Sequence, residues 1–220
     1  IIDQAAQRGI KIIVIDSDVN SSQVSCRIGT NNLQAGIKAA EAALATDDEE
    51  LYIGIVNYDV NSANGQQREL GFRQTVEQDP RVKDITTINV LSTTEDARAG
   101  AKEMLLSDSR INVVVTFNEW TSLGVGWAIR DLNRADRIQV VAFDSNVVSV
   151  GMLETGEVDA LIVQNPYAMG YLGVETAANL MNGQPGGPSV VDTATTIVTR
   201  ENMYEPESQK ILFSFEEEGY

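Results

Sequence analysis

The chain has 220 residues, 43% of them hydrophobic, and its 32 acidic and 16 basic side chains give a formal charge of −16. A chain of this length can bury a large core, either as one large domain or as two small ones. No window is apolar for long enough to cross a membrane. The acidic excess argues against a nucleic-acid or polyphosphate partner, because neutralising phosphates needs clustered Lys and Arg, and favours a neutral or cationic small ligand.

The sequence contains one cysteine and no histidine. A disulfide framework, the usual zinc sites and a His-based catalytic triad are therefore excluded, and no cofactor or metal is predicted. Cys26, in "VSCRIGT", is expected to be a small buried strand residue. The chain has no initiator Met and opens with "IIDQAAQRGIKIIVIDSD", a pattern typical of a helix running into a strand, so we expect that its start is cut.

Six apolar runs are continuous rather than alternating, which predicts buried parallel strands covered on both faces. These runs are 11–16, 52–58, 85–91, 112–117, 138–144 and 160–164. The segments between them have helical spacing. They are 32–46, 63–79, 95–108, 120–134, 146–155 and 166–182. Strict alternation of strand and helix predicts an open, doubly wound α/β sheet with helices on both faces.

Polar residues before several of these helices predict their N-caps. The candidates are Asn118 or Thr121, Ser145 and Asn165. Pro166 suits the first turn of the helix that follows Asn165.

The end of the sequence predicts less regular structure. "NGQPGGPS", 182–189, is expected to be a loop, and "TATTIVT", 193–199, a late short strand. The tail from 200 to 220 is expected to form a short helix and irregular chain that ends in a solvated run of Glu.

The strand count is uneven along the chain. Five strands between 52 and 164 make a nearly complete sheet, whereas 1–30 supply one long strand and one short one. A lobe built from the latter alone would leave apolar faces uncovered. Either the front of the chain is missing, or another polypeptide completes the lobe.

Polar side chains follow four predicted strands. They are Asp16, Asn118, Asp144 and Gln164. In open α/β sheets the ligand crevice lies beyond the carboxyl ends of the strands. These side chains can form the paired hydrogen bonds that hold vicinal hydroxyls, although Asn118 and Asp144 could instead cap the helices that follow them.

Helix starts offer further candidates. Arg68, in "SANGQQRELGFRQTV" with Phe72 on the core face, could reach over a crevice or lie in solvent. Trp120 could present a flat face to a sugar ring or pack on its own helix. Glu95 could contact a ligand or compensate the helix dipole. No nucleophile elbow, phosphate loop or dinucleotide fingerprint is present.

Seven stretches together resemble a known family. They are "VIDSD", "IGTNNLQAG", "ANGQQRELGF", "FNEWTSLG", "VVAFDSN", "VQNPYAMGYLGVETAANLMNGQ" and "TIVTRENM". In order and spacing they are similar to ribose-binding and related periplasmic sugar-binding proteins, over nearly the whole chain. The resemblance implies two similar α/β lobes, joined by three crossing segments, that close on a sugar in the cleft between them.

The resemblance also implies a division of the chain. Residues 1–30 and 165–195 would form the rear part of the N-terminal lobe, and 31–164 and 196–220 the C-terminal lobe. The family's opening portion, with the aromatic residues that sandwich the sugar, has no counterpart here. The isolated 220 residues are therefore expected to bind weakly or not at all unless a partner chain completes the first lobe.

The family's ligand-binding residues carry over at four positions, to a hydroxyl-binding Asp, an Asn, a second Asp and a hinge Gln. These are Asp16, Asn118, Asp144 and Gln164. Glu119 replaces the Asp that follows the family's Asn and is expected to be a helix-start anion.

The family's pattern is broken at three positions. Ser17 and Gln66 replace two Arg residues, and Glu95 replaces an aromatic residue, while Arg68 matches a second, more structural Arg. These departures argue against ribose itself and leave another pentose, a hexose, a polyol or an amino sugar open. Trp120 could substitute for the lost aromatic residue.

The resemblance implies a non-enzymatic receptor that closes on a polyhydroxylated ligand and delivers it to the membrane permease of an ATP-driven importer. It would be periplasmic, or a lipoprotein held at the outer surface. Two other functions stay open: a ligand-sensing effector domain of a lactose-repressor-type regulator or of a receptor kinase, and an α/β enzyme that uses Asp16 or Asp144. An upstream helix-turn-helix would indicate a repressor, and an upstream signal peptide would indicate export.

Overall fold

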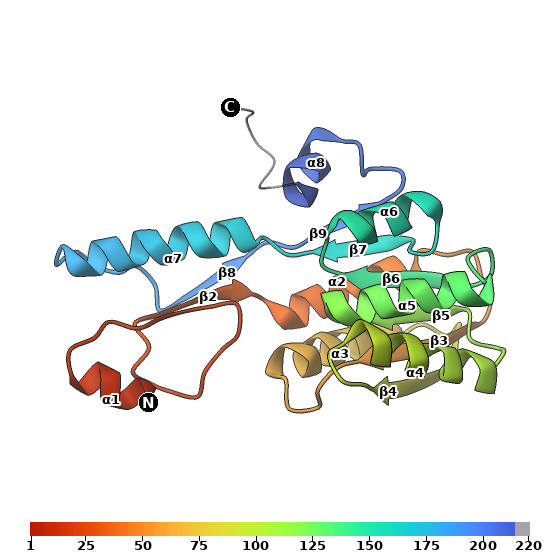
Figure 1. Ribbon diagram of the computed structural model, residues 1–220, viewed down its shortest axis with the longest axis horizontal. Coiled ribbons are helices and arrows are strands. Elements are labelled where there is room, and N and C mark those ends of the chain that lie inside the picture. The colour runs from red at the N-terminus through yellow and green to blue at the C-terminus, as the bar shows by residue number, and fades with distance from the viewer. Residues whose placement is uncertain (214–220) are drawn as a thin grey trace. The chain divides into compact units, whose positions relative to one another are not determined.

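The computed structural model describes residues 1–213, which fall into two compact units (Figure 1). The first unit comprises Ile1–Asn31 and Gln164–Thr195. The second comprises Asn32–Val163 and, among the described residues, 196–213. The chain therefore passes between the units three times.

The second unit is built on a six-stranded sheet in the order β4-β3-β5-β6-β7-β9. All neighbouring strands pair in parallel except β7 and β9, which are antiparallel. The strands are β3 (Leu51–Asn57), β4 (Val82–Asn89), β5 (Val113–Thr116), β6 (Gln139–Phe143), β7 (Ala160–Val163) and β9 (Thr196–Thr199). The helices are α2 (Asn32–Leu44), α3 (Ala63–Val76), α4 (Thr94–Ser107), α5 (Glu119–Leu132), α6 (Val147–Thr155) and α8 (Pro206–Leu212).

Two apolar clusters cover the two faces of this sheet. On one face, α2 and α3 contribute buried Ala residues, Phe72 and Val76. On the other face, α4, α5 and α6 contribute residues such as Met104, Ile129 and Leu153. The central strands β5 and β7 are buried along their whole length, as the continuous Val and Ile runs predicted. The predicted doubly wound α/β architecture is confirmed.

The prediction of full burial is wrong for one strand of this sheet. β4 lies at the edge and pairs with β3 alone, and its residues are half-buried or exposed. An edge strand has a neighbouring strand on one side only, so its other side is open to water. A continuous apolar run therefore does not by itself imply a buried strand. In the first unit, β1 (Ile13–Ile15) is likewise half-buried, and its last residue is exposed.

The first unit contains a three-stranded parallel sheet in the order β1-β2-β8. The other two strands of this sheet are β2 (Cys26–Thr30) and β8 (Val190–Thr193). The helices of the unit are α1 (Ile2–Gln7) and α7 (Pro166–Met181). Its small core joins Cys26 and Ile28 of β2 to Met169 of α7, which confirms the prediction for Cys26. The sequence did not predict β8, in which Val190 and Asp192 are exposed.

Apolar side chains remain on the surface of the first unit. α7 buries only Met169 and Thr176 along its 16 residues. Its exposed apolar residues are Tyr167, Tyr171, Val174 and Met181. Tyr167 and Tyr171 stack on each other with ring centroids 6.4 Å apart.

The predicted helix starts are confirmed at two positions and wrong at one. Asn118 caps α5, and Asn165 caps α7 with Pro166 in the first turn. Asn146, not Ser145, caps α6, because its side chain accepts from two amides while Ser149 bonds back to the cap.

The tail forms the predicted short helix, α8, and the closing Glu run lies outside the described residues. Within residues 1–213, every helix is too short or too polar to span a bilayer.

Helices α2 and α3 approach each other closely because each has a glycine at the contact. A Cβ on Gly71 would lie 2.1 Å from the carbonyl oxygen of Leu33, and one on Gly36 would lie 2.0 Å from that of Arg68. Both obstacles are backbone atoms, so neither helix can accept a side chain there without moving. Gly151 in α6, by contrast, has nothing within 4 Å of the position a Cβ would take.

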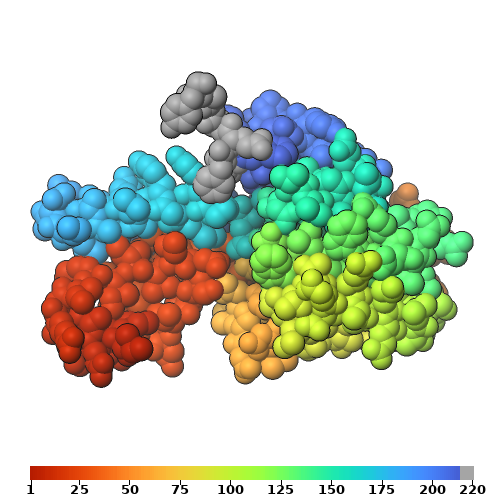
Figure 2. Space-filling model, viewed as in Figure 1, coloured from red at the N-terminus to blue at the C-terminus, as the bar shows by residue number. Residues whose placement is uncertain are grey.

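Helices α4 and α5 adjoin along their length (Figure 2) and are joined by ion pairs at the surface. Arg98 of α4 binds both carboxylate oxygens of Asp131 of α5, at 2.6 and 2.8 Å, and Lys102 lies 3.1 Å from one of them. The hydrogen bonds from Arg98, and then those from Lys102, lower the pKa of Asp131 from 3.8 to about 2.

We expect Gly71→Ala to lower the free energy of unfolding by about 2 kcal/mol, because the added methyl forces α2 and α3 apart. Gly151→Ala is the matched control and should be neutral or stabilise by up to about 1 kcal/mol, since alanine favours helix. Urea unfolding followed by circular dichroism measures both. Equal effects of the two variants would contradict the close-contact argument.

We expect Asp131→Asn to destabilise the protein at neutral pH and to have a much smaller effect near pH 2. The folded-state pKa of Asp131 is lowered, so its stabilisation is present above the ordinary value of 3.8 and is lost as the pH falls towards about 2. Urea midpoints at a series of pH values measure this. Asp136→Asn is the control, because Asp136 is exposed and lies 4.0 Å from its partner Arg137.

Candidate functional site

The carboxyl edge of the second unit's sheet brings several polar residues together. Strands β5 and β6 are parallel and paired, with Val115 opposite Val141. Asn118 and Asp144 each follow three residues later, so they emerge side by side, about one strand spacing or 5 Å apart. The backbone N–H of Glu119 donates to Oδ2 of Asp144 at 3.1 Å, which links the two strand ends directly.

Asn118 is half-buried and acts as the N-cap of α5. Its Oδ1 accepts from the backbone N–H of Thr121 at 3.0 Å and from the Thr121 hydroxyl at 2.7 Å. Its Nδ2 donates to Oγ of Ser92 at 2.7 Å. An amide nitrogen carries two hydrogens, so the bond to Ser92 uses only one N–H of Asn118. The capping alternative is confirmed.

Asp144 does not cap the helix that follows it, which was the alternative expectation. It accepts instead from Glu119, the first residue of the neighbouring helix α5. Its backbone is left-handed, with φ of +67°. Glu119 is a first-turn anion of α5, as expected, and its carboxylate accepts from Nδ2 of Asn146 at 2.6 Å.

Asp16 shares this backbone conformation, with φ of +63°. Among the described residues, Asn133 is the third non-glycine residue with positive φ, and it ends α5. Asp16 and Asp144 thus both place a carboxylate at a strand end at a backbone cost of about 1 kcal/mol each. Strain of this kind persists where the surrounding structure or a function requires it.

Three other candidates of the second unit lie in first turns of helices at the same edge. Gln66 is in α3, Glu95 in α4 and Trp120 in α5, and all three are exposed. Trp120 exposes 48% of its surface, so about half of the residue is accessible to another molecule.

Arg68 is not in solvent, which corrects that expectation. It is 2% exposed, and its Nε donates to Oδ1 of Asn32 at 2.8 Å. Its Nη1 donates to the carbonyl of Phe117 at 2.7 Å, and Cζ lies 4.8 Å from the ring centroid of Phe143. Arg68 therefore supports the ends of β5 and β6 from within, in agreement with the structural role that the resemblance implied.

The remaining three candidates belong to the first unit. Asp16 and Ser17 are exposed after β1, and the Ser17 hydroxyl lies 3.5 Å from Oδ2 of Asp16. Gln164 is half-buried, and its Oε1 accepts from the hydroxyl of Thr30, at the end of β2, at 2.7 Å.

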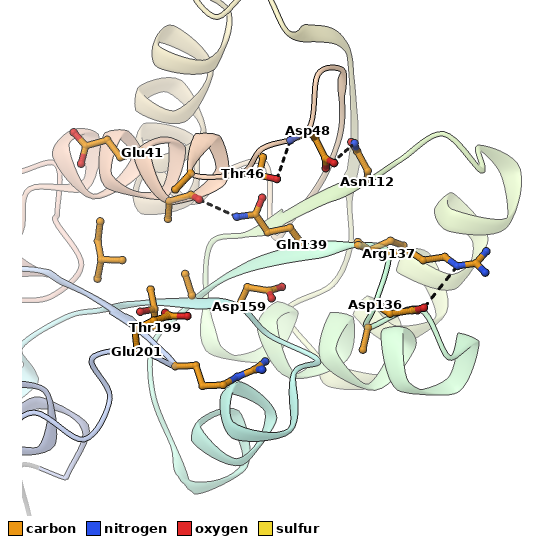
Figure 3. Close-up of a pocket in the computed structure, with 17 residues that line it drawn as sticks. Glu41, Thr46, Asp48, Asn112, Asp136, Arg137, Gln139, Asp159, Thr199 and Glu201 are labelled. Carbon is orange, nitrogen blue, oxygen red and sulfur yellow. Dashed lines mark hydrogen bonds and ion pairs between the residues drawn. The ribbon is translucent and has the colours of Figure 1, made fainter.

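A pocket of about 720 Å³ lies at the opposite, amino edge of the second unit's sheet (Figure 3). It is lined by the C-terminal end of α2 and by the starts of β5, β6 and β7, and none of the predicted site residues contributes to it. The sequence did not predict this pocket. Its available signal was a polar residue at each of these strand starts, Asn112, Gln139 and Asp159, whereas the prediction considered only the carboxyl ends of strands.

Two polar groups in this pocket are held by backbone atoms. Oδ2 of Asp159 accepts from the N–H of Val140 at 2.7 Å, and burial raises the pKa of this carboxyl. Nε2 of Gln139 donates to the carbonyl of Ala42 at 3.0 Å, while its buried Oε1 has no partner in the described chain. Within residues 1–213, no three His, Cys, Asp or Glu side chains are grouped to hold a metal ion.

Comparison with known proteins identifies relatives over most of the chain. The family model described as "Periplasmic binding protein domain" matches residues 1–185. The "D-ribose/D-allose-binding protein" of Pseudomonas aeruginosa is 25% identical in an alignment 211 residues long, which covers 90% of this chain and 65% of that protein. The chain thus spans slightly less than two thirds of that relative's length.

Solved structures agree with this relationship. A carbohydrate transporter solute-binding protein from Agrobacterium radiobacter, in complex with D-arabinose, is 29% identical with a TM-score of 0.91, over 96% of this chain and 73% of that one. The periplasmic component of an ABC-type sugar transport system from Hahella chejuensis is 30% identical with a TM-score of 0.85, over 90% of this chain and 73% of that one. The predicted fold and family are confirmed: the chain belongs to the periplasmic binding protein domain family.

Proposed function

We propose that this chain binds a small polyhydroxylated ligand, a sugar or polyol, as part of a solute receptor for an ATP-driven importer. The observation that carries the proposal is the side-by-side emergence of Asn118 and Asp144 from paired strands, in a chain 29% identical to a carbohydrate solute-binding protein solved with D-arabinose. A sugar hydroxyl both donates and accepts hydrogen bonds. A carboxylate beside an amide N–H offers both complements.

The proposed contacts divide by chemistry. Asp144 accepts from hydroxyls, and the remaining N–H of Asn118 donates to one. The half-exposed indole of Trp120 suits contact with the apolar face of a sugar ring. Gln66 and Glu95 supply further polar groups from neighbouring helix starts. We propose ligand contacts for Asp16, Ser17 and Gln164 of the first unit as well.

The proposed mechanism is binding without bond chemistry. A ligand shifts a conformational equilibrium only by its difference in affinity for the two states. Closure on the sugar therefore requires hydrogen bonds that are complete only in the closed protein, and the membrane permease would recognise that closed form. The named relatives are binding proteins rather than enzymes, which favours this mechanism over turnover.

Export to the periplasm, or a lipid anchor at the outer surface, is part of this proposal and is supported by the family's periplasmic members.

A second part of the proposal concerns the surface of the first unit. Its exposed apolar residues on α7, together with half-exposed Ile15 of β1, support further polypeptide covering them, supplied by the same gene product or by a partner chain.

The ligand class is tested by calorimetric titration of the complete gene product with D-ribose, D-allose and D-arabinose, and with a polyol and an amino sugar. We expect one-to-one binding of at least one of these. The break in the family pattern at Ser17, Gln66 and Glu95 favours a ligand other than D-ribose. A panel that gives no heat and no thermal stabilisation would contradict the proposal.

We expect Asp144→Ala to weaken binding of the best sugar by about 10- to 100-fold, because it removes a charged hydrogen-bond acceptor. Asp136→Ala is the matched control, since Asp136 is an exposed carboxylate on the pocket at the opposite edge of the same sheet. It should leave the affinity unchanged. Equal losses in the two variants would show that Asp144 has no particular role.

A further inference from the structure

The hydroxyl of Ser122, in the first turns of α5, joins the ends of β5 and β6. Ser122 is 1% exposed. Its Oγ lies 2.8 Å from the hydroxyl of Thr116 and 2.7 Å from the carbonyl of Asn118. It accepts from the N–H of Phe143 at 2.9 Å and lies 2.9 Å from the carbonyl of that residue. One hydroxyl therefore contacts β5, the turn after it, and the last residue of β6.

Arg68 reaches the same two strand ends from the opposite face of the sheet. Its helix, α3, packs with α2 on one face, whereas α5 packs with α4 on the other. Arg68 bonds to the carbonyl of Phe117 and lies over the ring of Phe143. We call Ser122 and Arg68 together the strand-end brace.

The brace acts one residue before each proposed ligand contact. Phe117 immediately precedes Asn118, and Phe143 immediately precedes Asp144. The two rings also pack edge to face, with centroids 5.8 Å apart. A buried network whose hydrogen bonds are satisfied holds its members in a single arrangement, because breaking any bond leaves a buried polar group without a partner.

We propose that Ser122 and Arg68 are positioning residues for ligand binding, which set the spacing between Asn118 and Asp144 and thereby the choice among sugar epimers. Both side chains are at most 2% exposed, so they act through their neighbours rather than by touching the ligand. The proposal rests on the proposed function above. Since a hydrogen bond weakens steeply as its geometry departs from the optimum, a small change in spacing affects one epimer more than another.

The test is Ser122→Ala in the complete gene product, titrated with the best-binding sugar and with its nearest epimer. We expect an affinity loss of about tenfold for the best sugar and a smaller loss for the epimer, so that selectivity falls. Ser122→Thr keeps the hydroxyl and should recover most of the selectivity. If Ser122 were merely structural, Ser122→Ala would lower stability and leave the ratio of the two affinities unchanged. That result would overturn the proposal.

Ser107→Ala is the matched control. The Ser107 hydroxyl also donates to a backbone carbonyl within its own helix, that of Met104 at 2.8 Å, but it lies in the last turn of α4. This variant should keep both affinity and selectivity. If it reduced selectivity as much as Ser122→Ala, the effect would not belong to the brace.

A second measurement needs no sugar. The N–H of Glu119 is bonded to Asp144, so its hydrogen exchange reports the spacing of the strand ends. Ser122→Ala should accelerate exchange of the Glu119 and Phe143 amides, and Ser107→Ala should not. If no sugar binds the wild type, the proposed function fails while this measurement still decides on the brace. If Ser122→Ala does not fold, Arg68→Lys is judged by the same criteria.

Discussion

The burial of parallel strands on both faces is the constraint on which the rest of this structure depends. Where helices cover both sides of a sheet, its interior favours apolar side chains, and a buried polar one needs a partner, as Thr116 has in Ser122. Polar chemistry is then confined to the strand ends and to the helix starts beside them. Here β5 and β7 are buried throughout, and Asn118 and Asp144 appear at the first positions after β5 and β6 where a polar side chain can reach the surface.

The same constraint explains why two buried polar side chains lie behind those positions. Ser122 and Arg68 are almost inaccessible, yet each bonds to backbone atoms at the ends of the strands. A strand end needs such partners because its last carbonyls have left the ladder and are still buried. Stability and, under the proposed function, ligand geometry therefore depend on the same few hydrogen bonds.

The sequence predicted the α/β alternation, the helices and the caps Asn118 and Asn165, because these follow from local periodicity and local hydrogen bonds. It was wrong on the burial of β4 and on the position of Arg68, since edge position and helix packing depend on residues far apart in the chain. It also missed β8, which pairs with β2 across more than 150 residues, and the pocket at the amino edge. The placement of Asn118 and Asp144 followed from strand ends alone.

The left-handed backbone at Asp16 and Asp144 has a consequence for the evolution of related chains. Glycine adopts this conformation without steric cost, and asparagine adopts it more readily than most residues. Asp144 also accepts from the N–H of Glu119, so its replacement would remove that bond as well as the strain. If Asp16 contacts a ligand as proposed, a descendant that no longer binds one would gain stability by exchanging Asp16 for glycine, and position 16 would then record which lineages still bind.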